Sequence, residues 1–446
     1  MAPRRRVAAG ADREPRVAEG IVAEQITRGL DRLCQLDSYT PVAVPGARVD
    51  GQIIAYASPD STFAVTRRLI QGATSSILIG TYDFTASYVA DLLVAAVGRG
   101  VKVQLMLDLD GRSGEMALYD GLTAAGIRTH PAPACGAGHA NYFPSCHEKV
   151  TVIDGEWVLV QSGNYTESSI PPNDPSPTST LPQVPGNRDM GLAIQSKSLA
   201  RFFTRLLKAD IKRAVTNITR EGLAQVFEPE VLMFEAAPPI VPEIVPDKTF
   251  TVSSQRVQAV VSPDNYVAVA EALLRSATKS IDIEQQYIRP TQPQVGRLLA
   301  AIKAARAANP KLRIRIIVAA GFAGADIERL RGEMNLLAKK HDLAFGSKVR
   351  LLNKKYFVHC HNKLIIVDGE RVLVGSQNWS DFGVSRNREA GILVTHKGIA
   401  DYFTGLVAFD WRTGVKTLPA ARPKTAPTRA MTPAAVRVRY GDYADV

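Results

Sequence analysis

The segment SPDSTFAVTRRLIQGATSSILIGTYDF, residues 58–84, decides the fold because a second copy follows it as SPDNYVAVAEALLRSATKSIDIEQQYI, residues 262–288. Each copy opens with a run typical of a helix and closes with a β-branched run, ATSSILIG or ATKSIDIE, typical of a buried strand. A second helix and strand follow in both copies, as VADLLVAAVGRGVKVQLMLD and VGRLLAAIKAARAANPKLRIRIIVA. Strands that alternate with helices predict βα units and a mostly parallel sheet.

The repeat continues with HEKVTVIDGEWVLVQSGNYTES, residues 147–168, and HNKLIIVDGERVLVGSQNWSDF, residues 361–382. It then resumes with NRDMGL and NREAGI, around Arg188 and Arg388. The first copy carries extra residues at 170–186, whose six prolines exclude a helix or a central strand and predict an exposed loop. We therefore expect an α/β fold of two duplicated βα units, with mostly parallel sheets packed about a pseudo-twofold axis and the active site between the halves.

The repeat also sets the expected boundaries. These are an N-terminal extension at 1–50, a first catalytic half at 51–215, a proline-rich connection at 216–255, a second catalytic half at 256–413 and a basic tail at 414–446. The Pro- and Ala-rich tail has the composition of a disordered segment. Apolar residues of the connection could meet acyl chains or equally belong to a core: Val231, Leu232, Met233 and Phe234.

Each half carries one His-x-Lys-x4-Asp pattern. The residues are His147, Lys149 and Asp154 in the first half and His361, Lys363 and Asp368 in the second. Side chains two apart on a strand share a face, so each histidine should lie beside its lysine while the aspartate lies on the opposite face. An imidazole and an ammonium side by side suit a phosphate: the lysine neutralises oxygens, and the histidine supplies a nucleophile or a proton. One such pair is common in any protein, but its recurrence within a duplicated unit predicts a catalytic site.

Polar residues follow each pattern at matched positions. Hydroxyl and amide groups that can bind phosphate oxygens come first: Ser162 and Asn164, then Ser376 and Asn378. Asp189 and Glu389 follow, and a carboxylate against the far nitrogen of an imidazole would fix its tautomer. Asp154 and Asp368 are each followed by a glycine and could also simply close a turn. Tyr165 and Trp379 suit packing as well as substrate contact. His359, two residues before His361, is a weaker second candidate.

Composition narrows the function less than the repeat does. The net charge of +11 suits an anionic membrane surface, a nucleic acid or a phosphate-binding pocket equally well. No apolar stretch is long enough to span a membrane, and no apolar run follows the first basic residues as in a signal peptide. We expect a cytoplasmic protein or one peripheral to a membrane, with export left open. The four cysteines are too scattered for a zinc site: Cys34, Cys135, Cys146 and Cys360. Cys146 and Cys360 suit small buried positions, and a Cys135–Cys146 disulfide stays open.

These residues resemble the paired signature motifs of the phospholipase D superfamily. HEKVTVID and HNKLIIVD each match its His-x-Lys-x4-Asp pattern, and GSQNWS matches its Gly-Ser-x-Asn turn, where the first half reads QSGN. The resemblance implies a phosphoric diester hydrolase in which His147 attacks phosphorus and forms a phosphohistidine, while His361 acts as acid and base. It implies that Asp189 orients His147 and that Glu389 orients His361. It implies no metal or other cofactor, and no oligomer is required for the site.

The resemblance leaves two substrate classes. A phospholipid would be hydrolysed to phosphatidic acid, or its phosphatidyl group transferred, and this is our leading expectation. The alternative is a metal-independent nuclease that cleaves DNA or RNA through the same two histidines. The basic tail also allows peripheral contact with an anionic membrane.

Overall fold

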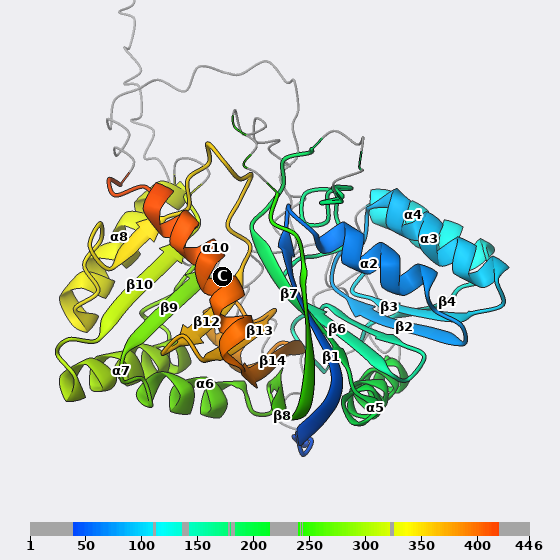
Figure 1. Ribbon diagram of the computed structural model, residues 1–446, viewed down its shortest axis with the longest axis horizontal. Helices are drawn as coiled ribbons and strands as arrows, with labels where there is room; N and C mark the ends of the chain where they lie inside the picture. The colour runs from blue at the N-terminus through cyan, green and yellow to red at the C-terminus, as the bar shows by residue number, and fades with distance from the viewer. Residues whose placement is uncertain are drawn as a thin grey trace, which may run out of the picture.

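The computed structural model describes residues 39–109, 113–135, 142–176, 179, 183–214, 240, 242, 244–321 and 325–418. Two halves of similar build lie side by side and share one 14-stranded sheet (Figure 1). Its strand order is β11-β10-β9-β12-β13-β14-β8-β1-β7-β6-β5-β2-β3-β4. The order of the second half, read from the centre outward, repeats that of the first. The duplication inferred from the sequence is therefore confirmed as two α/β units.

The first half contains β1 (Gly46–Ser58), α2 (Thr62–Gln71), β2 (Ser76–Thr81), α3 (Ser87–Gly98), β3 (Lys102–Leu107), α4 (Ser113–Ala124), β4 (Arg128–Pro131), β5 (Val150–Ile153), β6 (Trp157–Gln161), β7 (Asp189–Gln195) and α5 (Lys197–Arg213). The second half contains β8 (Lys248–Ser262), α6 (Tyr266–Arg275), β9 (Ser280–Gln285), α7 (Pro293–Ala308), β10 (Arg313–Val318), α8 (Ala325–His341), β11 (Val349–Leu351), β12 (Lys363–Val367), β13 (Arg371–Gly375), α9 (Asp381–Ser385), β14 (Glu389–Thr395) and α10 (Lys397–Thr413).

The sheet is mixed, which corrects the expectation of mostly parallel sheets. Only the outer strands β2-β3-β4 and β9-β10-β11 pair in parallel, where helices cross between strands. The inner strands pair antiparallel. The reason is local: β5 and β6 are joined by a tight turn, as are β12 and β13, and a tight turn can join only antiparallel neighbours. The motif strands thus belong to hairpins.

The long strands β1 and β8 join the two halves at the centre of the sheet. They pair antiparallel from Gly46 opposite Gln258 to Ala55 opposite Lys248. β1 therefore begins inside the expected extension at 1–50, and β8 begins inside the expected connection at 216–255. Regular structure reaches into both ranges because each strand supplies hydrogen-bond partners to the other.

Helices cover the sheet in three groups. Helices α2, α3 and α4 pack on the first half, and α6, α7 and α8 on the second. Helices α5 and α10 pack on the other face, where a core cluster that includes β1 and β8 continues across both halves. The halves therefore share one apolar core, so burial of that core stabilises the catalytic halves together.

Two buried arginines tie each half to the other. Arg188 Nε donates to Asp410 Oδ2 at 2.8 Å, so a residue just before β7 reaches α10 of the second half. Arg388 Nε donates to Asp210 Oδ2 at 2.8 Å, so a residue just before β14 reaches α5 of the first half. Each guanidinium also lies over a ring, Arg188 over Phe357 at 4.1 Å and Arg388 over Phe143 at 4.3 Å.

Candidate active site

The segments that carry the two histidines cross toward the opposite half. The His147 amide donates to the Arg388 carbonyl at 2.8 Å, and the His361 amide donates to the Arg188 carbonyl at 3.1 Å. Matching isolated β-bridges join Cys146 to Arg388 and Arg188 to Cys360. Each histidine is therefore held beside the residue that follows the arginine of the other half.

That residue is a carboxylate in both cases. His147 Nδ1 lies 3.0 and 2.9 Å from the two carboxylate oxygens of Glu389. His361 Nδ1 lies 2.9 Å from Asp189 Oδ1. The expected pairing was wrong, because Asp189 contacts His361 and Glu389 contacts His147. The cause is the crossing of the backbone segments, which the repeat does not reveal.

Each carboxylate is held by the serine of its own half. Ser162 Oγ donates to Asp189 Oδ1 at 2.8 Å, and Ser376 Oγ donates to Glu389 Oε2. The two serines thus orient carboxylates, whereas the sequence had suggested that they bind phosphate. Burial raises the pKa of Asp189, but attraction to His361 and Lys363 and the hydrogen bonds from His361 and Ser162 outweigh it and hold this pKa below its usual value. An ionised Asp189 keeps the His361 Nδ1 proton in place and leaves Nε2 for chemistry.

Both lysines lie beside their histidines, on the expected face. Lys149 Nζ donates to the His147 carbonyl at 2.7 Å. Lys363 Nζ donates to the His361 carbonyl at 2.8 Å and lies 3.0 Å from His361 Nε2. All four side chains are buried, so their charges act in a low-dielectric setting. This arrangement can stabilise a negatively charged group that binds next to the Nε2 atoms.

The two asparagines keep an unused acceptor. Asn164 Oδ1 and Asn378 Oδ1 are buried and have no hydrogen-bond partner among the described residues. Buried polar atoms are nearly always paired in folded proteins. Both amides thus remain candidates for contact with a bound ligand.

Asp154 and Asp368 stand apart from this centre, which argues against their expected catalytic role. The Asp154 carboxylate accepts hydrogen bonds from the amides of Thr74, Ser75 and Ser76 and from two of their hydroxyls, at 2.8 to 3.0 Å. Asp368 accepts equivalent amide bonds from Thr278, Lys279 and Ser280. Each lies at the far end of its strand from the histidine, in the turn of the hairpin, and ties the turn to the loop before β2 or β9.

Three buried side chains near the motifs were missed. The Tyr82 ring lies 4.9 Å from the His147 ring and 5.4 Å from Lys149 Nζ. Glu148, between His147 and Lys149, is 1% exposed, and its Oε1 would lie 3.1 Å from a Cβ added at Gly80 on β2. Glu284 on β9 accepts from Asn362 Nδ2 at 2.9 Å, and Asn362 is the residue equivalent to Glu148. The two copies of the repeat differ at these three positions, so residues that match between the copies do not identify them.

Glu148 is held in its protonated form. Burial raises its pKa to about 8, and the nearby Asp210 carboxylate adds to the effect, although Arg388 opposes it. Burial likewise raises the pKa of Glu284, with a further contribution from Asp410. Each half therefore holds one buried carboxyl behind its histidine–lysine pair.

Other residues singled out in the sequence serve packing. Trp379 is buried and donates to Tyr266 at 3.0 Å, and Tyr165 is buried with its hydroxyl 2.6 Å from Thr151 Oγ1. Cys146 and Cys360 are buried free thiols, so the Cys135–Cys146 disulfide does not form. The His359 carbonyl accepts from the Arg188 amide, so its backbone belongs to the crossing segment.

The proline-rich loop is clamped at its base. Asn173 Nδ2 donates to the carbonyls of Pro59 and Val184, and Asn173 Oδ1 accepts from the Val184 amide. The Gly186 carbonyl accepts from Val358 of the second half. Asn173 and Gly186 at the loop base are thus buried, whereas Ser176 and Gln183 are exposed, and residues 177–178 and 180–182 lie outside the described residues. Residues 231–234 and the tail beyond Leu418 lie outside the described residues.

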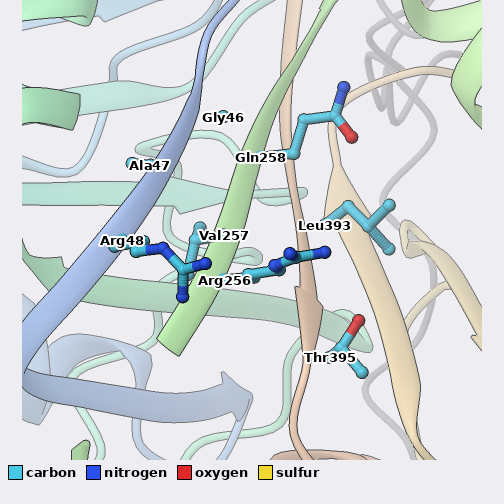
Figure 2. Close-up of a pocket in the computed structure, with 8 residues that line it drawn as sticks. All are labelled: Gly46, Ala47, Arg48, Arg256, Val257, Gln258, Leu393 and Thr395. Carbon is cyan, nitrogen blue, oxygen red and sulfur yellow. The ribbon is translucent and has the colours of Figure 1, made fainter. Parts of the chain in front are cut away.

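A surface hollow of about 400 Å³ lies elsewhere, over β1, β8 and β14 (Figure 2). Arg48 and Arg256, which are register partners on β1 and β8, line it. No histidine or lysine of the two motifs lines this hollow, so it is distinct from the histidine–lysine centre. Among the described residues, no helix is long and apolar enough to cross a membrane.

The role of Asp154 can be tested by Asp154→Ala. Loss of the carboxylate leaves three loop amides without an acceptor, so unfolding should become easier by about 1–3 kcal/mol, as measured by urea denaturation. The control is Asp401→Asn, which removes an exposed pair with Lys397 and should cost less than ~1 kcal/mol. Turnover of folded Asp154→Ala reduced as far as in a His147 variant would return Asp154 to the catalytic set.

The raised pKa of Glu148 predicts a pH dependence of stability. Between the ordinary glutamate pKa and about 8, the folded protein keeps a proton that the unfolded chain releases, so its unfolding free energy falls as pH rises. Glu148→Gln carries no titrating group, so its stability relative to the parent should increase from pH ~5 to pH ~8. Urea denaturation at both pH values measures this, with exposed Glu370→Gln as control. A difference that is independent of pH would contradict a protonated Glu148.

Known proteins resemble this chain in family and in fold. The family model described as "Cardiolipin synthase, PLD-like domain" matches twice, at residues 66–211 and 271–411. The fold is similar to phosphatidylserine synthase from Haemophilus influenzae, with a TM-score of 0.57 and 14% identity over 88% of this chain and 91% of that one. Nuc from Salmonella typhimurium, a phospholipase D family member, is 22% identical and covers 38% of this chain and 96% of its own, with a TM-score of 0.30. No curated protein sequence matches the chain.

The two family matches together span more than half of the chain. The first contains His147 and Lys149, and the second contains His361 and Lys363. The chain therefore belongs to the phospholipase D superfamily of phosphodiesterase-type enzymes, as two fused copies of the cardiolipin synthase PLD-like domain.

Proposed function

We propose that the protein cleaves the headgroup-side phosphodiester bond of a phospholipid through a phosphohistidine on His147. The observation that carries the proposal is the crossed pair of buried imidazoles. Each has its Nδ1 on a carboxylate of the opposite half and a lysine beside it. Such an arrangement provides two similar Nε2 atoms, one to attack phosphorus and one to carry a proton.

In the first step, neutral His147 Nε2 attacks phosphorus and a P–N bond forms. The P–O bond to the headgroup breaks, and His361 gives its Nε2 proton to the leaving alkoxide, which departs as an alcohol. Lys149 and Lys363 balance the charge on the phosphate oxygens, and Asn164 and Asn378 contact the same group. In the second step, water attacks phosphorus while His361 takes its proton. The P–N bond then breaks, which releases phosphatidic acid and restores both histidines. An acceptor alcohol in place of water would complete a phosphatidyl transfer.

Glu389 and Asp189 have matched supporting roles. Glu389 orients His147 and stabilises the positive charge that its ring acquires in the phosphohistidine. Asp189, which is held in its ionised form, does the same for the protonated state of His361. The phosphate therefore reacts between two imidazoles that are each oriented by a carboxylate of the partner half.

A phospholipid is favoured as substrate by the family and by the fold. The matching family model is named for cardiolipin synthase, and the similar fold of phosphatidylserine synthase extends over most of both chains. Nucleic acid is the competing substrate class for the same chemistry.

The roles of the histidines predict distinct variant behaviour. His147→Ala and His361→Ala should each lower turnover by several orders of magnitude without unfolding the protein. His361→Asn should accumulate a phosphatidyl group on His147, because the residue that takes the proton from the attacking water is lost, and mass spectrometry of the quenched enzyme would locate it. His396→Asn is the control, since His396 caps α10 through the Ile399 amide and asparagine is a good cap. A phosphatidyl group trapped on His361 in His147→Asn, together with none on His147 in His361→Asn, would reverse the assignment.

The substrate class can be decided by a panel assayed with one preparation. We expect phosphatidic acid from phosphatidylcholine, phosphatidylglycerol or cardiolipin in mixed micelles, and no cleavage of single- or double-stranded DNA. Activity should survive chelation by EDTA, because two lysines supply the positive charge at the phosphate. Cleavage of DNA with no release of phosphatidic acid would replace the lipid proposal by a nuclease, while the histidine roles would stand.

A further inference from the structure

The two halves of the active site differ at one equivalent position beside the histidines. Tyr82 and Gln286 occupy the same place in the repeat, one residue after β2 and one residue after β9. Matched β-bridges follow both, Phe84 to Tyr165 and Ile288 to Trp379. The backbone therefore follows the same path, and the Tyr82 ring lies 4.9 Å from the His147 ring. By this equivalence Gln286 extends toward His361.

Local contacts place the end of β9 against the His361 motif. Gln285 is the register partner of Lys363, and the Gln285 carbonyl accepts from Cys360 Sγ at 3.6 Å. Cys360 and Lys363, which lie on either side of His361 in the chain, thus both contact Gln285, the residue before Gln286.

The Gln286 side chain is buried, and its amide group is not hydrogen-bonded within the described part of the chain. It is 2% exposed, and neither its Nε2 nor its Oε1 has a hydrogen-bond partner among the described residues. An amide enclosed in this way is costly unless a ligand pairs with it. The equivalent position in the first half carries an aromatic ring against His147, so only the His361 side offers an amide here.

We propose that Gln286 binds a hydroxyl group of the leaving alcohol, so that the enzyme selects headgroups with a free hydroxyl. The inference rests on the proposed function, in which His361 protonates that alcohol. A carboxamide offers one donor and one acceptor group, which match a hydroxyl and not a quaternary ammonium. The neighbouring Tyr287 ring is already covered by Arg289, whose guanidinium carbon lies 4.1 Å from the ring centroid. The Arg289 cation therefore already covers one face of that ring.

Two lipids isolate this contact. Phosphatidylglycerol and phosphatidylpropanol have the same charge, acyl chains and headgroup length, but the second lacks both free hydroxyls. With full-length protein in mixed micelles, kcat/KM for phosphatidic acid release should favour phosphatidylglycerol by about tenfold or more, because a site built to bond a hydroxyl rejects the analogue without it. Gln286→Met keeps the side-chain length and removes both polar atoms, so the ratio should fall close to one.

Controls separate the possible outcomes. Gln255→Met makes the same exchange on β8, away from the site, where the Gln255 amide bonds the Thr395 carbonyl, and it should keep the parent ratio. Gln286→Asn serves if the methionine variant does not fold, and its shortened amide should also lower the ratio. A parent ratio near one, or an unchanged ratio in folded Gln286 variants, would overturn the assignment and leave the proposed function intact. No phosphatidic acid from either lipid, with DNA cleaved by the same preparation, would overturn the proposed function and this inference with it.

Discussion

The crossed arginine–aspartate pairs are the constraint on which the active centre depends. Arg388 bonds Asp210, Asp264, the Ser262 carbonyl and the Tyr39 hydroxyl. Arg188 bonds the matching Asp410, Asp60 and Ser58 carbonyl. A buried charge is tolerated only when it is paired and fully hydrogen-bonded, and loss of one partner typically costs about 3–5 kcal/mol. The residue after each arginine is the carboxylate that orients a histidine of the other half. Correct docking of the halves and correct orientation of the imidazoles are therefore one event.

The duplication has diverged where each half holds its buried carboxyl group. The first half has Gly80 on β2 and Glu148 in the motif, whereas the second has Glu284 on β9 and Asn362 in the motif. A side chain at Gly80 would overlap Leu207 and approach Glu148, and the residue equivalent to Leu207 is the smaller Val407. The first half therefore carries its buried carboxyl group on the motif segment, beside a glycine of β2. The second half carries its carboxyl group on β9, beside the Asn362 amide of the motif. A buried acid behind each motif is retained, but it reaches its place from different strands.

This divergence makes the two histidines chemically unequal although their carboxylates match. His147 has an aromatic neighbour in Tyr82 and the unbonded carboxyl of Glu148 behind it. His361 has the amide of Asn362 behind it, which links Glu284 to the backbone of Lys363. The two imidazoles therefore have different neighbours, a ring and a carboxyl group on one side and an amide on the other.

The sequence alone determined the duplication, the α/β class, the two histidine–lysine pairs and the shared face of each pair. These follow from periodicity and from spacing along one strand, which depend on near neighbours in the chain. Only the tertiary structure decided that Asp189 serves His361, that Glu389 serves His147, and that Ser162 and Ser376 bind these carboxylates. It also placed Asp154 and Asp368 in the hairpin turns, and it showed the inner strands to be antiparallel. The physical reason is that two equal halves offer two equivalent pairings, within a half or across the axis. Strand spacing is identical for both, and the contacts between halves, from the crossing backbone segments and the buried arginines, choose the crossed one.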